Sequence, residues 1–273
     1  MGEFFDRRRF PRIADARARI GTIDSHSTAL DRAVAADVVL QHLFVPPAQD
    51  VDGIRYAAYY RFAEKHSGGD IIDVYRCSRG DVNLSLTDIS GKGVGAALHA
   101  GLVKYGIRAY STERHDPKTV LRWLNRFYLE NDEFEHSNSF ASVFFGRYRS
   151  AERTLSYASA GHDGVFLMPP QGDTIMRLSH TGPVVGVFED GEDLFAQDAL
   201  FVEPETVLVA VSDGITEARR EGELFGMERL TAAALQLRDC SLEDIACGIA
   251  REAIAFACDR VIDDMAVLAV KFD

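Results

Sequence analysis

The chain has 273 residues, of which 47% are hydrophobic and 26% are charged, an ordinary composition for a globular protein with a sizeable core. Its formal net charge of -12 argues against a protein built to neutralise nucleic-acid phosphates or to dock on anionic membranes. No apolar run approaches the roughly 20 residues that span a bilayer, and the start lacks a hydrophobic signal segment. We therefore expect a cytoplasmic protein that binds neither nucleic acid nor membrane.

The four cysteines support the same expectation about location. None of them forms a CxxC pair, and all lie in apolar contexts that resemble helices or strands. The pattern favours reduced, buried thiols rather than disulfides or a metal site. They are Cys77, Cys240, Cys247 and Cys258.

The N-terminal part differs in composition from the rest of the chain. Residues 1–44 hold an arginine-rich arm, read as a solvated tail or a partner-binding arm, followed by a segment with apolar residues at helical spacing. Ser27 or Thr28 is placed to cap that helix, and the proline pair beginning at Pro46 ends it. We expect residues 1–44 to form an arm with a connecting helix, and residues 45–273 to form the main domain.

After the prolines, short β-type runs alternate with pairs of helical segments. Glycine-containing turns separate the runs, which favours hairpins and largely antiparallel sheets. The pattern predicts an α+β fold, a β-sandwich of two sheets flanked by helices. The expected strands cover residues 53–62, 70–77, 81–89, 139–149, 154–161, 164–168, 206–214 and 265–272, and the expected helices cover residues 94–111, 117–131, 227–237 and 241–256.

Acidic side chains recur where the expected strands meet turns. A short carboxylate at a strand end is held by the sheet yet points into a loop-lined cleft, and nearby glycines let ligands approach. Clusters of oxygen ligands suit hard ions such as Mg²⁺ or Mn²⁺ rather than zinc. Turn chemistry alone explains any single one of these aspartates, and spacing alone does not show that they converge. They are Asp70 and Asp73 in "SGGDIID", Asp88 in "LTDISGKG", Asp213 in "AVSDGITE", and Asp263 and Asp264 in "RVIDDMAVLAV".

An ordered set of motifs resembles one protein family. "SGGDIID", "TDISGKGVGAAL", "SYASAGHDGVFLM", "TGPVVGV", "SDGITEARREGELFGMERL" and "DDMAVLAV" occur in the order typical of the SpoIIE/RsbU-like branch of the PPM metal-dependent protein phosphatases. The resemblance covers residues 40–273. It implies a β-sandwich flanked by helices in α-β-β-α layers, two Mn²⁺ or Mg²⁺ ions, and hydrolysis of phosphoserine or phosphothreonine in proteins.

The resemblance also implies roles for individual residues. Asp70, Asp88 and Asp213 match the catalytic acids. Asp70 and Asp88 would be shared by both metals, with one further oxygen from the Ile89 carbonyl. Asp213 and Asp263 would complete one metal site. Asp264 would be an alternative ligand or a residue behind the ligands, and Asp73 either a structural residue or a ligand.

The expected chemistry follows from two cations that activate a water and neutralise phosphate oxygens, without a phosphoenzyme. The family resemblance favours a phosphorylated STAS-type anti-anti-sigma protein as substrate, in stress signalling through sigma-factor control. The N-terminal helix is a possible regulator site or homodimer contact. A non-catalytic module that binds a phosphoprotein or partner is the alternative function.

Two departures from the resemblance affect the expected mechanism, a missing histidine and the alanine Ala266. No histidine follows Asp88 in "TDISGKG", so the general acid is unidentified; His162 is a tempting substitute, although a buried structural histidine is the favoured interpretation. Lys92 is either a phosphate contact or a solvated turn residue. Ala266 stands where relatives usually carry a hydroxyl. The "SGKGVG" turn is not a P-loop, because its lysine is followed by Gly93 rather than Ser or Thr.

Overall fold

The computed structural model describes residues 45–46, 49–51, 53–63, 69–77, 80–91, 94–112, 116–131, 139–172, 174–189, 191 and 193–273. The chain divides into two units, Met1–Leu43 and Phe44–Asp273, and the described residues all belong to the second. The predicted arginine-rich arm, the predicted N-terminal helix and Lys92 lie outside the described residues.

Two antiparallel sheets form the centre of the second unit. Sheet I has the strand order β1 (Gln49–Val51), β2 (Ile54–Arg61), β13 (Met265–Phe272), β10 (Val207–Val211), β7 (Val165–Met168) and β8 (Met176–Arg177). Sheet II has the order β3 (Ile71–Arg76), β4 (Val82–Ile89), β5 (Ala141–Arg149), β6 (Thr154–Ala160) and β9 (Asp198–Phe201). A small ribbon pairs β11 (Arg219–Arg220) with β12 (Glu223–Leu224).

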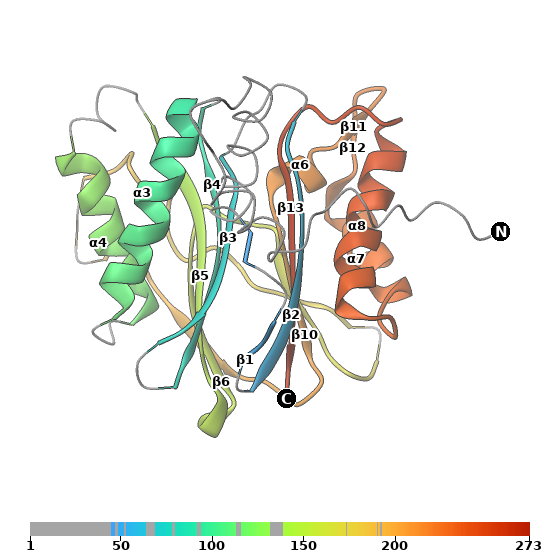
Figure 1. Ribbon diagram of the computed structural model, residues 1–273, viewed down its shortest axis with the longest axis horizontal. Coiled ribbons are helices and arrows are strands. Elements are labelled where there is room, and N and C mark those ends of the chain that lie inside the picture. Colours follow the sequence, from blue (N-terminus) through green and yellow to red (C-terminus); the bar gives the residue numbers. More distant parts are fainter. Residues whose placement is uncertain are drawn as a thin grey trace, which may run out of the picture. The chain divides into compact units, whose positions relative to one another are not determined.

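Helices cover the outer faces of both sheets, so that the layers are α-β-β-α (Figure 1). The helices α3 (Val94–Ser111) and α4 (Pro117–Glu130) pack on sheet II, and α7 (Gly226–Gln236) and α8 (Leu242–Phe256) lie on the outer side of sheet I. The short helix α6 (Asp213–Thr216) follows β10, and a 3-10 turn, η1 (Ser150–Glu152), follows β5. The predicted α+β sandwich is confirmed.

The alternation of side chains along the strands builds two apolar cores. In β10, Val209 faces the core shared with α7 and α8, whereas Leu208 faces the core between the two sheets. In β13, Val267 and Leu268 divide in the same way. Both faces of these strands are buried, so their sequences are continuously apolar rather than alternating with polar residues.

Local signals place the starts of two helices where the sequence predicts them. The Asp116 side chain accepts a hydrogen bond from the Thr119 amide at 2.9 Å, and Pro117 occupies the first turn of α4. The Ser241 hydroxyl accepts from the Asp244 amide at 3.1 Å at the start of α8. The short elements β8, β9, β11, β12 and α6 were not predicted, because two to four residues carry too little periodicity.

The prediction of buried cysteines is wrong, although all four thiols are free of disulfides. Cys240 and Cys258 are exposed, and Cys77 and Cys247 are half-buried. Cys240 and Cys258 lie in the turns after α7 and α8, where the chain leaves the packed face. Among the helices that the structure describes, none has the length and apolar character needed to cross a bilayer.

Candidate metal centre

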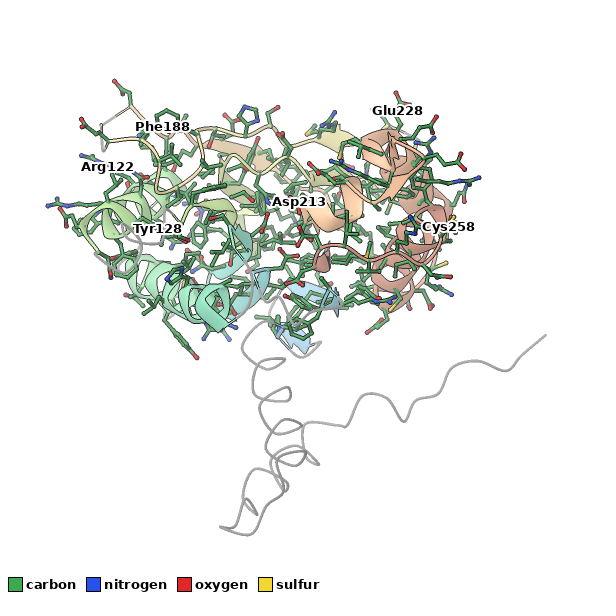
Figure 2. All side chains as sticks on the ribbon, turned by 90° about the horizontal axis from the view of Figure 1, so that it is seen from above. Arg122, Tyr128, Phe188, Asp213, Glu228 and Cys258 are labelled. Carbon is green, nitrogen blue, oxygen red and sulfur yellow. The ribbon has the colours of Figure 1, made fainter. Side chains whose placement is uncertain are left out.

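The predicted acidic residues come from four strand ends, two in each sheet. Asp70 directly precedes β3 and Asp88 is the penultimate residue of β4; these ends are adjacent because Ile71 pairs with Thr87. In sheet I, the end of β10 lies beside the start of β13, which brings Asp213 on α6 near the segment before Met265. Figure 2 shows Asp213 midway between the helix layer that carries Tyr128 and the layer that carries Cys258.

Asp264 joins the two sheets at this end through its carboxylate, which accepts three hydrogen bonds. Its Oδ2 accepts hydrogen bonds from the Tyr60 hydroxyl at 3.0 Å and the Gly69 amide at 3.1 Å, and its Oδ1 accepts from the Ala63 amide at 2.9 Å. Gly69 precedes β3 of sheet II, whereas Tyr60 belongs to β2 of sheet I. This buried residue therefore fixes the loop before Asp70 against the start of β13.

Two glycines allow the backbone to approach the site closely. A Cβ at Gly69 would lie 2.6 Å from the Ile89 carbonyl oxygen, and a Cβ at Gly214 would lie 1.9 Å from the Asp264 carbonyl oxygen. Both distances are too short for any other residue at the same backbone position. Glycine is thus required to hold the Ile89 carbonyl beside the Asp70 loop and α6 against the start of β13.

Ser212, the residue before Asp213, forms hydrogen bonds with Ala266 of β13. Its amide donates to the Ala266 carbonyl at 3.0 Å, and its hydroxyl accepts from the Ala266 amide at 2.9 Å. The hydroxyl that is absent from Ala266 is thus not needed to tie these two segments together. Asp263 accepts a hydrogen bond from the Asp264 amide at 3.0 Å.

The carboxylates influence one another's protonation. Burial, followed by the charges of Asp213 and Asp263, raises the pKa of Asp88 to about 7. Burial and then the Asp88 charge raise the pKa of Asp70 well above its usual range. Like charges in a partly desolvated space favour the protonated form of each carboxyl group.

The donor set fits a hard divalent cation bound by oxygen. Asp70 Oδ2 is buried without a hydrogen-bond partner, so it is a polar atom that a cation would satisfy. Within the described part of the chain, no three His, Cys, Asp or Glu side chains already enclose a metal position.

Asp73 is engaged elsewhere. It forms a bidentate ion pair with Arg108 of α3, at 2.6 Å and 2.7 Å, and lies 3.5 Å from the ammonium group of Lys104. The Arg108 guanidinium also stacks on the Tyr75 ring, 4.6 Å from its centroid. The structure therefore supports the structural interpretation of Asp73, as an anchor for α3.

His162 is buried behind the site. Its Nδ1 lies 3.0 Å from the Ser142 hydroxyl, and burial lowers its pKa to about 4. A histidine that stays neutral and shielded from water is poorly suited to deliver a proton to a substrate. The structural interpretation of His162 agrees with this position.

Tyr60, Ser212 and Arg108 were not predicted as parts of this region. The serine of "SDG" was the one local signal, since a hydroxyl next to a strand end can bond to backbone groups. Tyr60 and Arg108 carry no such signal, because their partners lie 204 and 35 residues away.

Comparisons with known proteins agree with this geometry. Residues 78–273 match the family model of stage II sporulation protein E (SpoIIE). The chain is 32% identical over 187 residues to protein IcfG of Synechocystis, covering 59% of this chain and 29% of that protein. It is 31% identical over 140 residues to the phosphoserine phosphatase RsbU of Bacillus subtilis, covering 51% and 40%. The chain thus aligns with less than half the length of these curated relatives.

Solved structures share the fold at low sequence identity. The PP2C phosphatase domain of Bacillus subtilis SpoIIE superposes with a TM-score of 0.66 at 17% identity, over 81% of this chain and 64% of that chain. RsbX, solved in complex with magnesium, superposes with a TM-score of 0.60 at 13% identity, over 83% and 99%. From the matched family model and the α-β-β-α sandwich, we conclude that the chain belongs to the SpoIIE family, within the SpoIIE/RsbU-like branch of the PPM phosphatases.

Proposed function

We propose that this protein is a metal-dependent protein serine/threonine phosphatase that uses Mn²⁺ or Mg²⁺. The observation that carries the proposal is the meeting of carboxylates from both sheets at one end of the sandwich, where burial and then the neighbouring acidic charges raise the pKa of Asp88 to about 7. Positive charge placed among such carboxylates favours their ionised form. The matched family, and a solved relative that holds magnesium, support the same cofactor class.

In this proposal, Asp70, Asp88, Asp213 and Asp263 hold two ions together with the Ile89 carbonyl oxygen. Divalent cations supply a water of lowered pKa and neutralise the charge on phosphate oxygens. Asp264 is the less suitable direct ligand of the acid pair, because three donors already occupy its carboxylate. Its proposed role is to hold Asp263 and the Asp70 loop in place.

The proposed substrate is phosphoserine or phosphothreonine on a regulatory protein, with a STAS-type protein favoured. The relative RsbU is named a phosphoserine phosphatase, which supports the phosphoserine class. We further propose that the N-terminal helix receives a regulator or forms a homodimer. Phosphate release from a phosphorylated STAS protein, compared with an unrelated phosphoprotein, tests the substrate assignment.

The central test measures hydrolysis of p-nitrophenyl phosphate and of a phosphorylated STAS protein with Mn²⁺. Asp88→Asn and Asp213→Asn each remove one carboxylate, and we expect activity on both substrates to fall by about 100-fold or more. Asp239→Asn is the matched control, because this exposed aspartate lies beyond the end of α7. Chelation of the metal should abolish the wild-type activity.

Equal activity in the wild type and both aspartate variants would refute the metal assignment. In a single turnover in ¹⁸O-labelled water, direct hydrolysis should place the ¹⁸O label in the released phosphate without a covalent intermediate. A trapped phosphoenzyme would contradict direct hydrolysis. Tight binding of the phosphoprotein without hydrolysis would support the alternative, a non-catalytic binding module.

A further inference from the structure

A second histidine, His180, and its partner Asp163 lie at the end of the sandwich that carries the acidic cluster. Residues 161–164 connect β6 of sheet II to β7 of sheet I at this end, because Ala160 pairs with Val143 near the start of β5. The connection presses closely on the end of β10, where a Cβ at Gly164 would lie 2.3 Å from the Val211 carbonyl oxygen. Asp163 is therefore held just beyond the segment that carries Asp213.

A series of contacts leads from Asp88 to this connection. Asp88 on β4 is paired in register with Ser142 on β5, which places their side chains on one face of sheet II. The Ser142 hydroxyl lies 3.0 Å from His162 Nδ1, and Asp163 is the next residue in the chain. Asp163 Oδ1 in turn lies 2.8 Å from His180 Nδ1. The path from Asp88 to His180 thus consists of one strand pairing, two short contacts and the peptide link between His162 and Asp163.

The backbone holds His180 in place on both sides. The Leu178 amide donates to the Val165 carbonyl at 2.9 Å, and the Thr181 amide donates to the Ser159 carbonyl at 2.7 Å. The segment is therefore fastened to both β7 and the end of β6. The imidazole of His180 is 59% exposed, and the side chain of Asp163 is 70% exposed. The pair is rigidly mounted but open to water and to a bound protein.

This arrangement has the properties that His162 lacks. A general acid needs contact with solvent to regain its proton, and a neighbouring carboxylate orients the imidazole. His162 is only 4% exposed and has no such access. His180 has both the access and the carboxylate.

We propose that His180, oriented by Asp163, is the general acid that protonates the leaving serine or threonine oxygen of the phosphoprotein. In the step, the oxygen of a water forms a bond to phosphorus as the bond between phosphorus and the side-chain oxygen breaks. The electron pair of the broken bond stays on the side-chain oxygen, which takes the proton of the His180 imidazolium. The water releases one proton to solvent, and His180 regains one from solvent.

This proposal rests on the proposed phosphatase activity, and the choice of leaving group tests it separately. Serine alkoxide is a poor leaving group that needs protonation, whereas p-nitrophenolate leaves readily without it. We expect His180→Asn to lower kcat on a phosphoserine protein by about 100-fold, within the usual range for a general acid, and to leave kcat on p-nitrophenyl phosphate within about threefold. Asp163→Asn should give a smaller loss with the same selectivity.

Two controls separate proton donation from structural damage. Glu130→Gln breaks the exposed Arg126–Glu130 pair on α4, so it should leave both substrates unaffected. The increase in melting temperature caused by Mn²⁺, measured by calorimetry without substrate, should be the same in His180→Asn and the wild type.

Equal losses on both substrates, or no loss on either, would overturn the assignment of His180. A reduced Mn²⁺-induced shift would also overturn it, because the histidine would then act through the metal site. A wild type that hydrolyses neither substrate would instead refute the proposed phosphatase function, and the two failures are thus distinguishable.

Discussion

At the scale of single residues, the environment of Asp88 makes the stability of the fold depend on pH. The carboxylate has a raised pKa because it is desolvated and faces other acids. The folded chain therefore binds the Asp88 proton more tightly than the unfolded chain does, and the associated stability is fully present below the unfolded pKa of about 3.8. That stability is lost as the pH rises through the folded pKa of about 7.

The variant Asp88→Asn removes this pH-dependent loss. Without metal at pH 8, we expect its melting temperature to exceed that of the wild type by about 5 °C, and the difference should shrink as the pH falls towards 4. With Mn²⁺ the order should reverse, because only the wild type gains stability from binding. Calorimetry across this pH range, with chelator or Mn²⁺, measures both effects; a constant difference at every pH would contradict the charge argument.

At the scale of elements, a buried ion pair anchors α3 to sheet II. Asp73 on β3 is 2% exposed and lies against Lys104, which is 6% exposed, and against the more accessible Arg108. In addition, Arg147 of β5 donates a hydrogen bond to the carbonyl of Ser111, at the end of α3, at 2.9 Å. The ion pair therefore fixes α3, the helix that follows Asp88, to β3, the strand that begins directly after Asp70.

Removing the shared carboxylate should be costly. Asp73→Asn leaves two cations facing a neutral amide, one of them buried, and we expect a loss of about 3–5 kcal/mol in the free energy of unfolding. Arg108→Met should cost less, because Lys104 still faces Asp73. Urea denaturation compares these variants with Arg126→Met, which breaks an exposed pair on α4 and should cost less than about 1 kcal/mol. A loss below 1 kcal/mol for Asp73→Asn would disprove the anchor.

At the scale of the whole described unit, the candidate site lies where the two sheets meet. Sheet II contributes Asp70 and Asp88, and the segments flanking β10 and β13 of sheet I contribute Asp213 and Asp263. Asp264 ties the two sides through a hydrogen bond from the Gly69 amide. A bound cation would add a second tie at the same end.

Metal binding should therefore protect both sheets at once. We expect Mn²⁺ to slow amide hydrogen exchange in residues 69–77 and 80–91 of sheet II and in residues 207–216 and 261–267 of sheet I. Mass spectrometry of exchanged peptides measures this, with Asp88→Asn as the control that should show little protection. Protection confined to one sheet would contradict a site shared between them.

The sequence by itself determined the architecture and the identity of the acidic candidates. Hydrophobic periodicity of 2 and 3.6 is a local property, so the long strands and the helices α3, α4, α7 and α8 were predictable. The ordered motifs added the family.

Only the tertiary structure decided which side chains meet. Asp73 and Asp88 look alike in sequence, since both are aspartates in a β-strand, yet one pairs with Arg108 and the other faces Asp213. Asp264 was predicted as an alternative ligand or a residue behind the ligands, and only the fold brings three donors to its carboxylate. His180 carries no sequence signal, because its partner Asp163 lies 17 residues away in the chain. The physical reason is that strand pairing and sheet packing set these distances, and both depend on contacts between residues far apart in the chain.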